Sequence, residues 1–307
     1  MKTILYFPRN ALQLLDKSHY DLPKLYAERQ WNVQFANSDI SSQEAISFLS
    51  FWKPDGCIVN NDRLPQKLFK DIPTVFTHRS QDDMPNGSTI VSYDERAIAQ
   101  LAARELLSLH CASYVYVPEG NGDYWDVTRA SEFVSAIRTG FQKTDVFPTP
   151  REGYRSHAYR AALARWLQKL PRPVGIFAAY DVISEIVLGT CQHIGLETPK
   201  DAMIVGVEND IAICENTRTT LSSIAFDEKR VVDASVQLLA RQMESRRPSA
   251  HNRVFVPPVG VVRRASTRIF TKADAQVIAA LDLIRIRGGD GLTAKEVVET
   301  FPCSRRM

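Results

Sequence analysis

The segment 172–210 constrains the fold most, because it holds two short apolar runs on either side of a helical pattern. The runs, 174–179 and 202–207, have the near-continuous hydrophobicity of parallel strands that are covered on both faces. Between them apolar residues recur at helical spacing, and Gly195 followed by Pro199 predicts the end of that helix. The segment therefore predicts a β-α-β unit of a parallel sheet.

Both predicted strands are followed directly by polar residues. Tyr180 and Asp181 follow the first strand, and Glu208, Asn209 and Asp210 follow the second. Since ligands of open parallel sheets bind at the carboxyl ends of the strands, we expect these side chains to line one ligand site. Carboxylates there suit a ligand that is rich in hydroxyl groups. The alternative is that Asp181 only caps the helix that follows it, a role for which Glu208 is less suited.

The same alternation of strand and helix patterns occupies the first 117 residues. Strands are predicted at 3–7, 31–36, 56–59, 74–77, 89–91 and 114–117, and helices at 42–52, 65–69 and 94–109. This rhythm indicates a doubly wound α/β domain. No predicted strand is followed by the glycine-rich fingerprint of dinucleotide-binding folds.

The second half of the chain indicates a second lobe. Gly120 and Gly122 lie in an irregular stretch that we interpret as the crossing into it, because glycine permits hinge geometry. The expected division is 1–118 with 227–250 for the N-terminal lobe, 119–226 with 251–266 for the C-terminal lobe, and 267–307 for a third part.

At these strand ends the chain resembles the effector domains of LacI/GalR-type repressors and sugar-binding proteins of the type I periplasmic-binding-protein fold. Tyr180-Asp181 and the segment 206–210 match two family segments that contact the ligand, Asn-Asp and Gly-x-Asp-Asn/Asp. The resemblance implies a fold of two doubly wound parallel sheets, with Tyr180, Asp181 and Glu208 in the ligand site between the lobes.

The resemblance supplies four further candidate ligand contacts. His78 and Arg79 match a polar pair of ribose-type binding proteins, although a solvated loop explains them equally well. Arg129, four residues before Phe133, matches an arginine that enters the family's cleft. Phe226 stands where the family often has Gln, so stacking would replace a hydrogen bond to the ligand.

Two candidates rest on their position alone. Asn10 follows the first strand, at its carboxyl end. Trp125 lies one turn before Arg129, and its aromatic face suits the C–H groups of a sugar ring. Packing in the core, or as a hydrophobic staple, explains Trp125 equally well.

The C-terminal tail has an all-α pattern. A helical stretch ends before a glycine-rich turn at 288–291, and Thr293 with Glu296 predicts a capping box that opens a second helix. Arg305 and Arg306 follow a turn, at the expected start of a third, basic helix. The tail resembles the beginning of an AraC-type helix-turn-helix domain, which implies DNA contacts for both arginines. Because the sequence stops at Met307, inside that third helix, we expect this form not to recognise operator DNA.

Composition narrows the possible functions. The net charge of +3 is too small for nucleic-acid binding by the whole surface, and the five cysteines form no C-x-x-C pair. No apolar run is long enough to span a bilayer, and Met1-Lys2 leads into a strand without an export signal, so we expect a cytoplasmic protein that contacts no membrane. The sequence also lacks nucleophile-elbow, metal-ligand and phosphate-loop patterns, so no enzymatic activity, metal or cofactor is expected.

These observations favour a sugar-responsive transcription regulator with the layout of xylose-operon activators of the AraC family. The expected partners are a monosaccharide effector such as xylose, operator DNA and a second copy in a homodimer. Two other classes stay open: a stand-alone sugar-binding protein, and, less in keeping with the motifs, an α/β enzyme.

Overall fold

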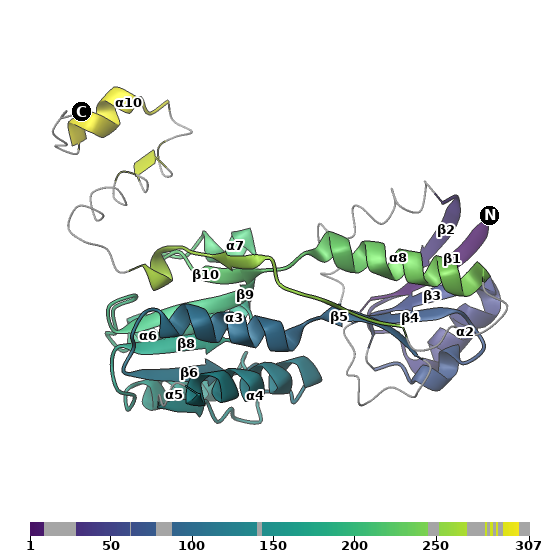
Figure 1. The fold of residues 1–307 in the computed structure, drawn as a ribbon, viewed down its shortest axis with the longest axis horizontal. Coiled ribbons are helices and arrows are strands. Elements are labelled where there is room, and N and C mark those ends of the chain that lie inside the picture. The colour runs from purple at the N-terminus through teal and green to yellow at the C-terminus, as the bar shows by residue number, and fades with distance from the viewer. Residues whose placement is uncertain are drawn as a thin grey trace. The chain divides into compact units, whose positions relative to one another are not determined.

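The computed structural model describes residues 1–8, 29–61, 63–77, 88–139, 143–244, 252–268, 280, 283–284, 287 and 291–300. The chain divides into two compact units, Met1–Thr267 and Arg268–Met307. The first unit contains two β-sheets with their helices (Figure 1). The second unit contains α10 (Ala294–Thr300), which begins with the predicted capping box, because Glu296 Oε2 accepts hydrogen bonds from the backbone and hydroxyl of Thr293.

The first sheet is entirely parallel, in the order β11-β5-β4-β3-β1-β2. Its strands are β1 (Lys2–Phe7), β2 (Trp31–Phe35), β3 (Gly56–Val59), β4 (Thr74–Thr77), β5 (Thr89–Tyr93) and β11 (Arg253–Val256). Its described helices are α2 (Ser42–Trp52), the 3-10 turn η2 (Gln66–Phe69) and α8 (Glu228–Glu244). Successive β1 residues face opposite sides: Ile4 joins the apolar cluster under α8, and Leu5 joins the one under α2.

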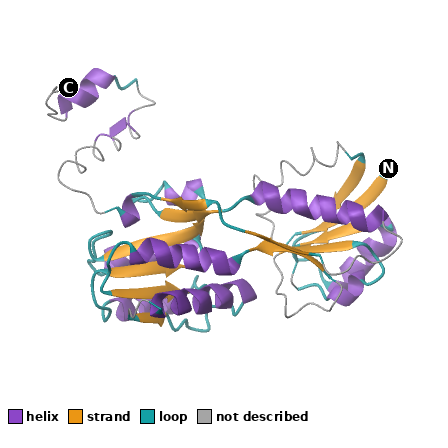
Figure 2. Cartoon of the chain, viewed as in Figure 1, coloured by secondary structure: helices purple, strands orange, loops and turns teal. Residues whose placement is uncertain are grey.

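The second sheet has the order β12-β10-β9-β8-β6-β7, with β12 antiparallel to β10. Its strands are β6 (Ser113–Val117), β7 (Thr144–Val146), β8 (Val174–Ala178), β9 (Ala202–Glu208), β10 (Ser222–Ala225) and β12 (Gly260–Val262). The accompanying helices, coloured purple in Figure 2, are α3 (Glu95–Leu107), α4 (Tyr124–Arg138), α5 (His157–Leu167), α6 (Asp181–His193), the short α7 (Ile211–Cys214) and the 3-10 turn η3 (Ala265–Thr267).

The predicted fold class is confirmed: the chain has two doubly wound, largely parallel sheets. In each sheet the first strand lies between the second and the third, which is a common doubly wound order. The β-α-β unit of the sequence appears as β8, α6 and β9, and Gly195 follows α6 with a φ of +75°, as its place at the end of the helix predicts.

The crossings between the sheets differ from the expected lobe boundaries. Residues 113–117 form β6, which pairs with β7 and β8, so the chain enters the second sheet between β5 and α3 rather than after residue 118. The loop that resembled a hinge follows β6 instead, where Asp126 accepts hydrogen bonds from Tyr116 Oη (2.6 Å) and the Gly120 N–H (3.1 Å). Residues 253–256 likewise pair with β5 in the first sheet, because the closing segment is divided between β11 and β12.

Three segments connect the sheets: β5 to α3, β10 to α8, and β11 to β12. They bond to one another through the backbone, since the Asp94 N–H donates to Val256 O and the Val259 N–H to Ala225 O, both at 2.9 Å. Tyr93 and Phe226, at two of the crossings, stack with ring centroids 3.9 Å apart. The crossings are therefore tied together by both backbone and side-chain contacts.

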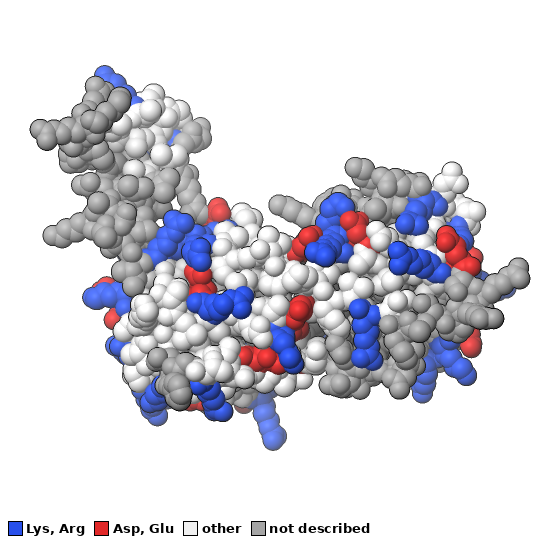
Figure 3. Space-filling view, viewed as in Figure 1, with Lys and Arg blue, Asp and Glu red and all other residues white. Residues whose placement is uncertain are grey.

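The described residues show neither a surface patch of one charge on the face in Figure 3 nor a disulfide. On the face shown in Figure 3, basic and acidic side chains lie interspersed rather than in one patch of a single sign. Cys57, Cys111, Cys191 and Cys214 are buried and unpaired. None of the described helices is long and apolar enough to cross a membrane.

Candidate ligand site at the carboxyl edge of the second sheet

The described candidate residues come from four neighbouring strand ends. Trp125 and Arg129 lie on α4, after β6; Tyr180 and Asp181 follow β8; Glu208 ends β9; and Phe226 follows β10. The strand order reverses between β6 and β8, and such switch points bind ligands in doubly wound sheets. Asn10, His78 and Arg79, and the tail residues Arg305 and Arg306, lie outside the described residues.

Arg129 is buried in this group of residues. Its Nε donates to Glu95 Oε2 and its Nη1 to the Ala179 carbonyl, each at 2.6 Å. Its guanidinium carbon lies 4.8 Å from the centroid of the Trp125 ring and 5.8 Å from that of Phe226. Nη2 makes no hydrogen bond with the described residues. One edge of the guanidinium is therefore fixed by protein, and one nitrogen is left for another acceptor.

Glu95, the counter-charge of Arg129, was missed at the sequence level. An acid in the first turn of a predicted helix is explained by the helix dipole alone, so nothing marks it as a buried partner. In the structure both side chains of the pair are only 5% exposed. Burial raises the pKa of the Glu95 carboxyl, and the adjacent guanidinium opposes that shift.

Aromatic rings surround Tyr180. Trp125 meets it edge-on at 5.9 Å between centroids, and Tyr154, which the sequence did not single out, does so at 6.3 Å. The Tyr180 hydroxyl donates to Glu119 Oε1 at 3.1 Å. The indole Nε1 of Trp125 is buried without a hydrogen-bond partner in the described part of the chain. A buried donor without a partner costs free energy, which an acceptor on a ligand would recover.

Asp181 lies fully buried behind these rings. Its Oδ2 accepts from the Asp210 N–H (2.8 Å) and the Cys214 thiol (3.2 Å), and burial raises its pKa to about 6. The alternative that Asp181 caps its own helix is wrong, because Tyr180 occupies the cap position of α6 and no side chain bonds the first turn there. It is Asp210 that caps a helix, α7, through the Ala212 N–H at 2.8 Å.

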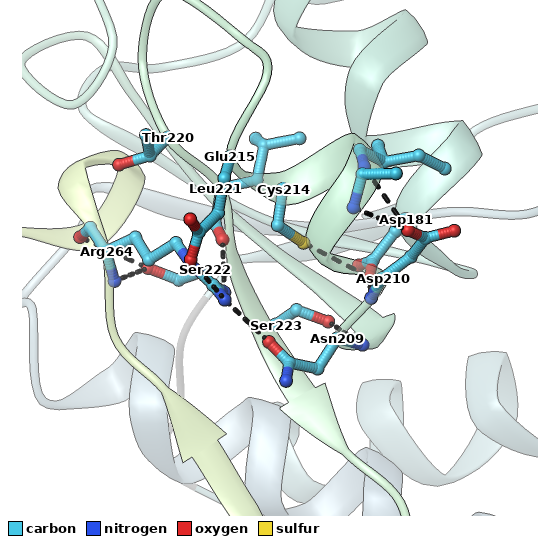
Figure 4. Close-up of polar contacts among 12 residues, drawn as sticks. Asp181, Asn209, Asp210, Cys214, Glu215, Thr220, Leu221, Ser222, Ser223 and Arg264 are labelled. Carbon is cyan, nitrogen blue, oxygen red and sulfur yellow. Dashed lines mark hydrogen bonds and ion pairs between the residues drawn. The ribbon is translucent and has the colours of Figure 1, made fainter. Parts of the chain in front are cut away.

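Glu208 is exposed at the end of β9, on unusual backbone. Its backbone φ is +102° and that of Asn209 is +55°, values that residues other than glycine rarely adopt. The Arg129 guanidinium is attracted to the Glu208 carboxylate. Arg264, also missed at the sequence level, donates Nη2 to Asn209 Oδ1 (2.8 Å) and Nη1 to the Leu221 carbonyl (3.0 Å) (Figure 4).

The arrangement suits a small polar ligand that has one apolar face. It offers a carboxylate, a guanidinium nitrogen, an indole N–H and aromatic rings at one edge of one sheet. No cluster of His, Cys, Asp and Glu able to hold a metal ion occurs among the described residues.

Comparison with known proteins gives the family. Residues 103–267, from α3 through η3, match the model of the periplasmic binding protein-like domain. The chain belongs to this family. The matched segment contains every described candidate residue of the site.

Known relatives include transcription regulators. The chain is 26% identical over 289 residues to the xylose operon regulatory protein of Escherichia coli K12, covering 91% of this chain and 72% of the relative. Among solved structures, the xylose-binding transcription activator xylR has a TM-score of 0.72 at 22% identity, covering 99% of this chain and 79% of that one. A LacI family regulator of Enterococcus faecium with bound ribose has a TM-score of 0.71 at 19% identity, covering 88% and 100%. At these identities the two structures show the shared fold alone.

Proposed function

We propose that this chain is the effector-sensing part of a sugar-responsive transcription regulator, with D-xylose or a closely related monosaccharide as effector. The observation that carries the proposal is the meeting of Arg129, Trp125 and Glu208 at the carboxyl edge of the second sheet, where Arg129 Nη2 and Trp125 Nε1 have no hydrogen-bond partner among the described residues. The xylose operon regulatory protein and the ribose-bound LacI family regulator support the class of ligand.

Each group has a distinct task in this proposal. The Glu208 carboxylate accepts hydrogen bonds from two neighbouring sugar hydroxyls, while Arg129 Nη2 and the Trp125 N–H donate to hydroxyl oxygens. The rings of Trp125 and Tyr180 cover the C–H face of the sugar, and Phe226 closes the side toward the crossings. Asn10, His78 and Arg79 of the N-terminal lobe complete the site, so that the ligand holds the two lobes together.

We further propose that residues 268–307 belong to an AraC-type helix-turn-helix domain, in which Arg305 and Arg306 contact DNA phosphates. The capping box at the start of α10 and the regulatory role named for the xylose operon relative support this assignment. The protein acts in the cytoplasm as a homodimer on operator DNA. Grafting a complete AraC-type domain after residue 267 should give operator binding that responds to the sugar, and a gel shift with operator and scrambled duplex tests it.

A melting screen tests the sugar assignment. The protein is melted with D-xylose, D-ribose, L-arabinose, D-glucose and a sugar alcohol, each over a range of concentrations. A ligand at 100 times its dissociation constant should stabilise the fold by about 2.7 kcal/mol. The Glu208→Gln variant should lose most of that shift, while Glu197→Gln, at an exposed acid near the opposite end of β9, should retain it. A flat response to every sugar contradicts the proposal.

A further inference from the structure

The backbone that presents Glu208 is strained. Among the described residues, Glu208 and Asn209 are the only two consecutive residues other than glycine with φ in the left-handed range. A side chain on such backbone is crowded by its own carbonyl groups, so the conformation persists only where surrounding contacts enforce it. Strain of this kind is concentrated at ligand sites, which makes the enforcing contacts informative.

Two side chains hold the amides that follow Glu208. Ser223 Oγ, on β10, accepts the hydrogen bond of the Asn209 N–H at 2.9 Å. Asp181 Oδ2, at the start of α6, accepts that of the Asp210 N–H at 2.8 Å. Figure 4 shows the two contacts, one from β10 and one from the start of α6, with Arg264 reaching the side chain of Asn209. The turn is thus fixed between β8 and β10.

Asp181 is itself fixed in place. Cys214 donates its thiol proton to the same Oδ2 at 3.2 Å, and Oδ1 lies over the α-carbon of Gly206. A Cβ atom at position 206 would stand 2.2 Å from Asp181 Oδ1 and 2.4 Å from Ser184 Oγ, so the carboxyl group fills the space that this glycine leaves. The side chain is fully buried, and Oδ1, which has no hydrogen-bond partner among the described residues, is covered by Gly206 and Ser184.

We infer that Asp181 is a positioning residue, which fixes the strained turn from which Glu208 meets the ligand and does not touch the ligand itself. This replaces the direct contact that the sequence suggested for Asp181, and it rests on the proposed role of Glu208. Gly206 serves the same purpose, because any side chain there displaces the carboxyl group.

The test combines a readout of the turn with a readout of binding. Hydrogen exchange of the Asn209 and Asp210 amides is followed in the ligand-free protein, and D-xylose affinity is measured by calorimetry. Asp181→Asn removes the charge at nearly constant volume, and Gly206→Ala displaces the carboxylate without altering it. The matched control is Asp201→Asn, because Asp201 also accepts a backbone hydrogen bond, from the Glu197 N–H at 3.0 Å, but at the opposite end of β9.

Both test variants should speed exchange of the two amides at least tenfold and weaken D-xylose binding by a similar factor, while the control changes neither. Weaker binding with unchanged exchange would show that Asp181 contacts the ligand and overturn the inference. Faster exchange with unchanged affinity would overturn it too, because the turn would then not serve the ligand. If the unmodified protein binds no sugar, the sugar assignment fails, and the exchange data alone decide whether Asp181 holds the turn.

Discussion

At the scale of single residues, the buried carboxyl group of Asp181 lowers the stability of the fold when it is ionised. Burial raises the pKa of the Asp181 carboxyl to about 6, although the Ser223 hydroxyl, the Asp210 N–H and the Cys214 thiol all favour its charged form. A carboxyl whose pKa rises on folding is worse solvated in the folded state than in the unfolded chain. The ionised Asp181 therefore costs stability, while its carboxylate holds the Asp210 N–H of the turn.

The first prediction follows from the sign of this shift. The folded-state pKa of Asp181 is about 6 and its ordinary value is 3.8, so its contribution to stability is full below about pH 4 and is lost as the pH rises through 6. Asp181→Asn does not titrate. The free energy of unfolding of the variant, minus that of the unmodified protein, should therefore grow by about 3 kcal/mol between pH 3 and pH 7. Urea titrations at several pH values measure it, and a constant difference contradicts it.

The second prediction concerns the strain at Glu208. Glu208→Gly removes a backbone strain of about 1–3 kcal/mol, while the added freedom of the unfolded chain costs about 0.5–1 kcal/mol. The variant should melt about 2–4 °C higher for each kcal/mol gained and should lose sugar binding. Lys53→Gly is the matched control, because Lys53 has a φ of +43° at the end of α2. It should raise the melting temperature and leave sugar affinity unchanged, whereas a destabilised Glu208→Gly would show that the turn is not strained.

Part of the site could be predicted from the sequence, for a physical reason. Strand periodicity places Tyr180, Asp181 and Glu208 at strand ends, and parallel strands end at one edge of their sheet. Glu95 and Arg264 could not be found in this way. Each acts through a partner that is distant in sequence, Arg129 and Asn209 respectively, and no local pattern encodes such a pair.

At the scale of elements, the buried ion pair between Glu95 and Arg129 links α3 to α4. The third prediction is that Glu95→Gln destabilises the fold by about 3–5 kcal/mol, because it removes the buried counter-charge that bonds the guanidinium and leaves only the exposed Glu208 carboxylate nearby. The double variant Glu95→Leu with Arg129→Met should cost less than the single one, since it removes both charges. Chemical denaturation of the three proteins measures this, and a single variant no less stable than the double one contradicts it.

Elements with a strong local signal were predicted well. Helix α2 has its predicted bounds, although the cap expected at Ser42 is formed by the preceding residue, Ser41, in a capping box with Glu44. The strand β7 and the helix α7 were not predicted. Each is only three or four residues long, too short to show a period, and α7 depends on a cap from Asp210.

At the scale of the whole molecule, the first three strands of each sheet have the same order, and the chain crosses between the two sheets three times. The sequence placed the β6 segment in the N-terminal lobe and the β11 segment in the C-terminal lobe, whereas β6 joins the second sheet and β11 the first, because strand pairing is decided by contacts between distant segments. Tyr93 and Phe226 illustrate the point: they lie more than a hundred residues apart in sequence, yet stack where two of the crossings meet. A change in the angle between the lobes would therefore move these two rings relative to each other.

The last prediction concerns the C-terminal residues of the first unit, which ends at Thr267. Ser266 Oγ donates to the Ile204 carbonyl (2.6 Å) and accepts from the Ser222 N–H (2.8 Å), and Thr267 Oγ1 bonds Ser222 Oγ at 2.7 Å. All three side chains are buried, so losing their partners leaves polar groups unsatisfied at about 1–3 kcal/mol each.

A chain that ends at residue 267 keeps these bonds and every described residue of the candidate site. It should fold, and it should bind D-xylose with the affinity of the 307-residue protein. A chain that ends at residue 263 loses Arg264 together with the serine and threonine contacts, and should melt at least 5 °C lower, since roughly 2–4 °C accompanies each kcal/mol at this size. Calorimetric melting and titration of the two chains make the comparison. Equal melting temperatures would show that η3 does not complete the unit. Weaker sugar binding by the 267-residue chain than by the 307-residue protein would place part of the ligand site beyond Thr267.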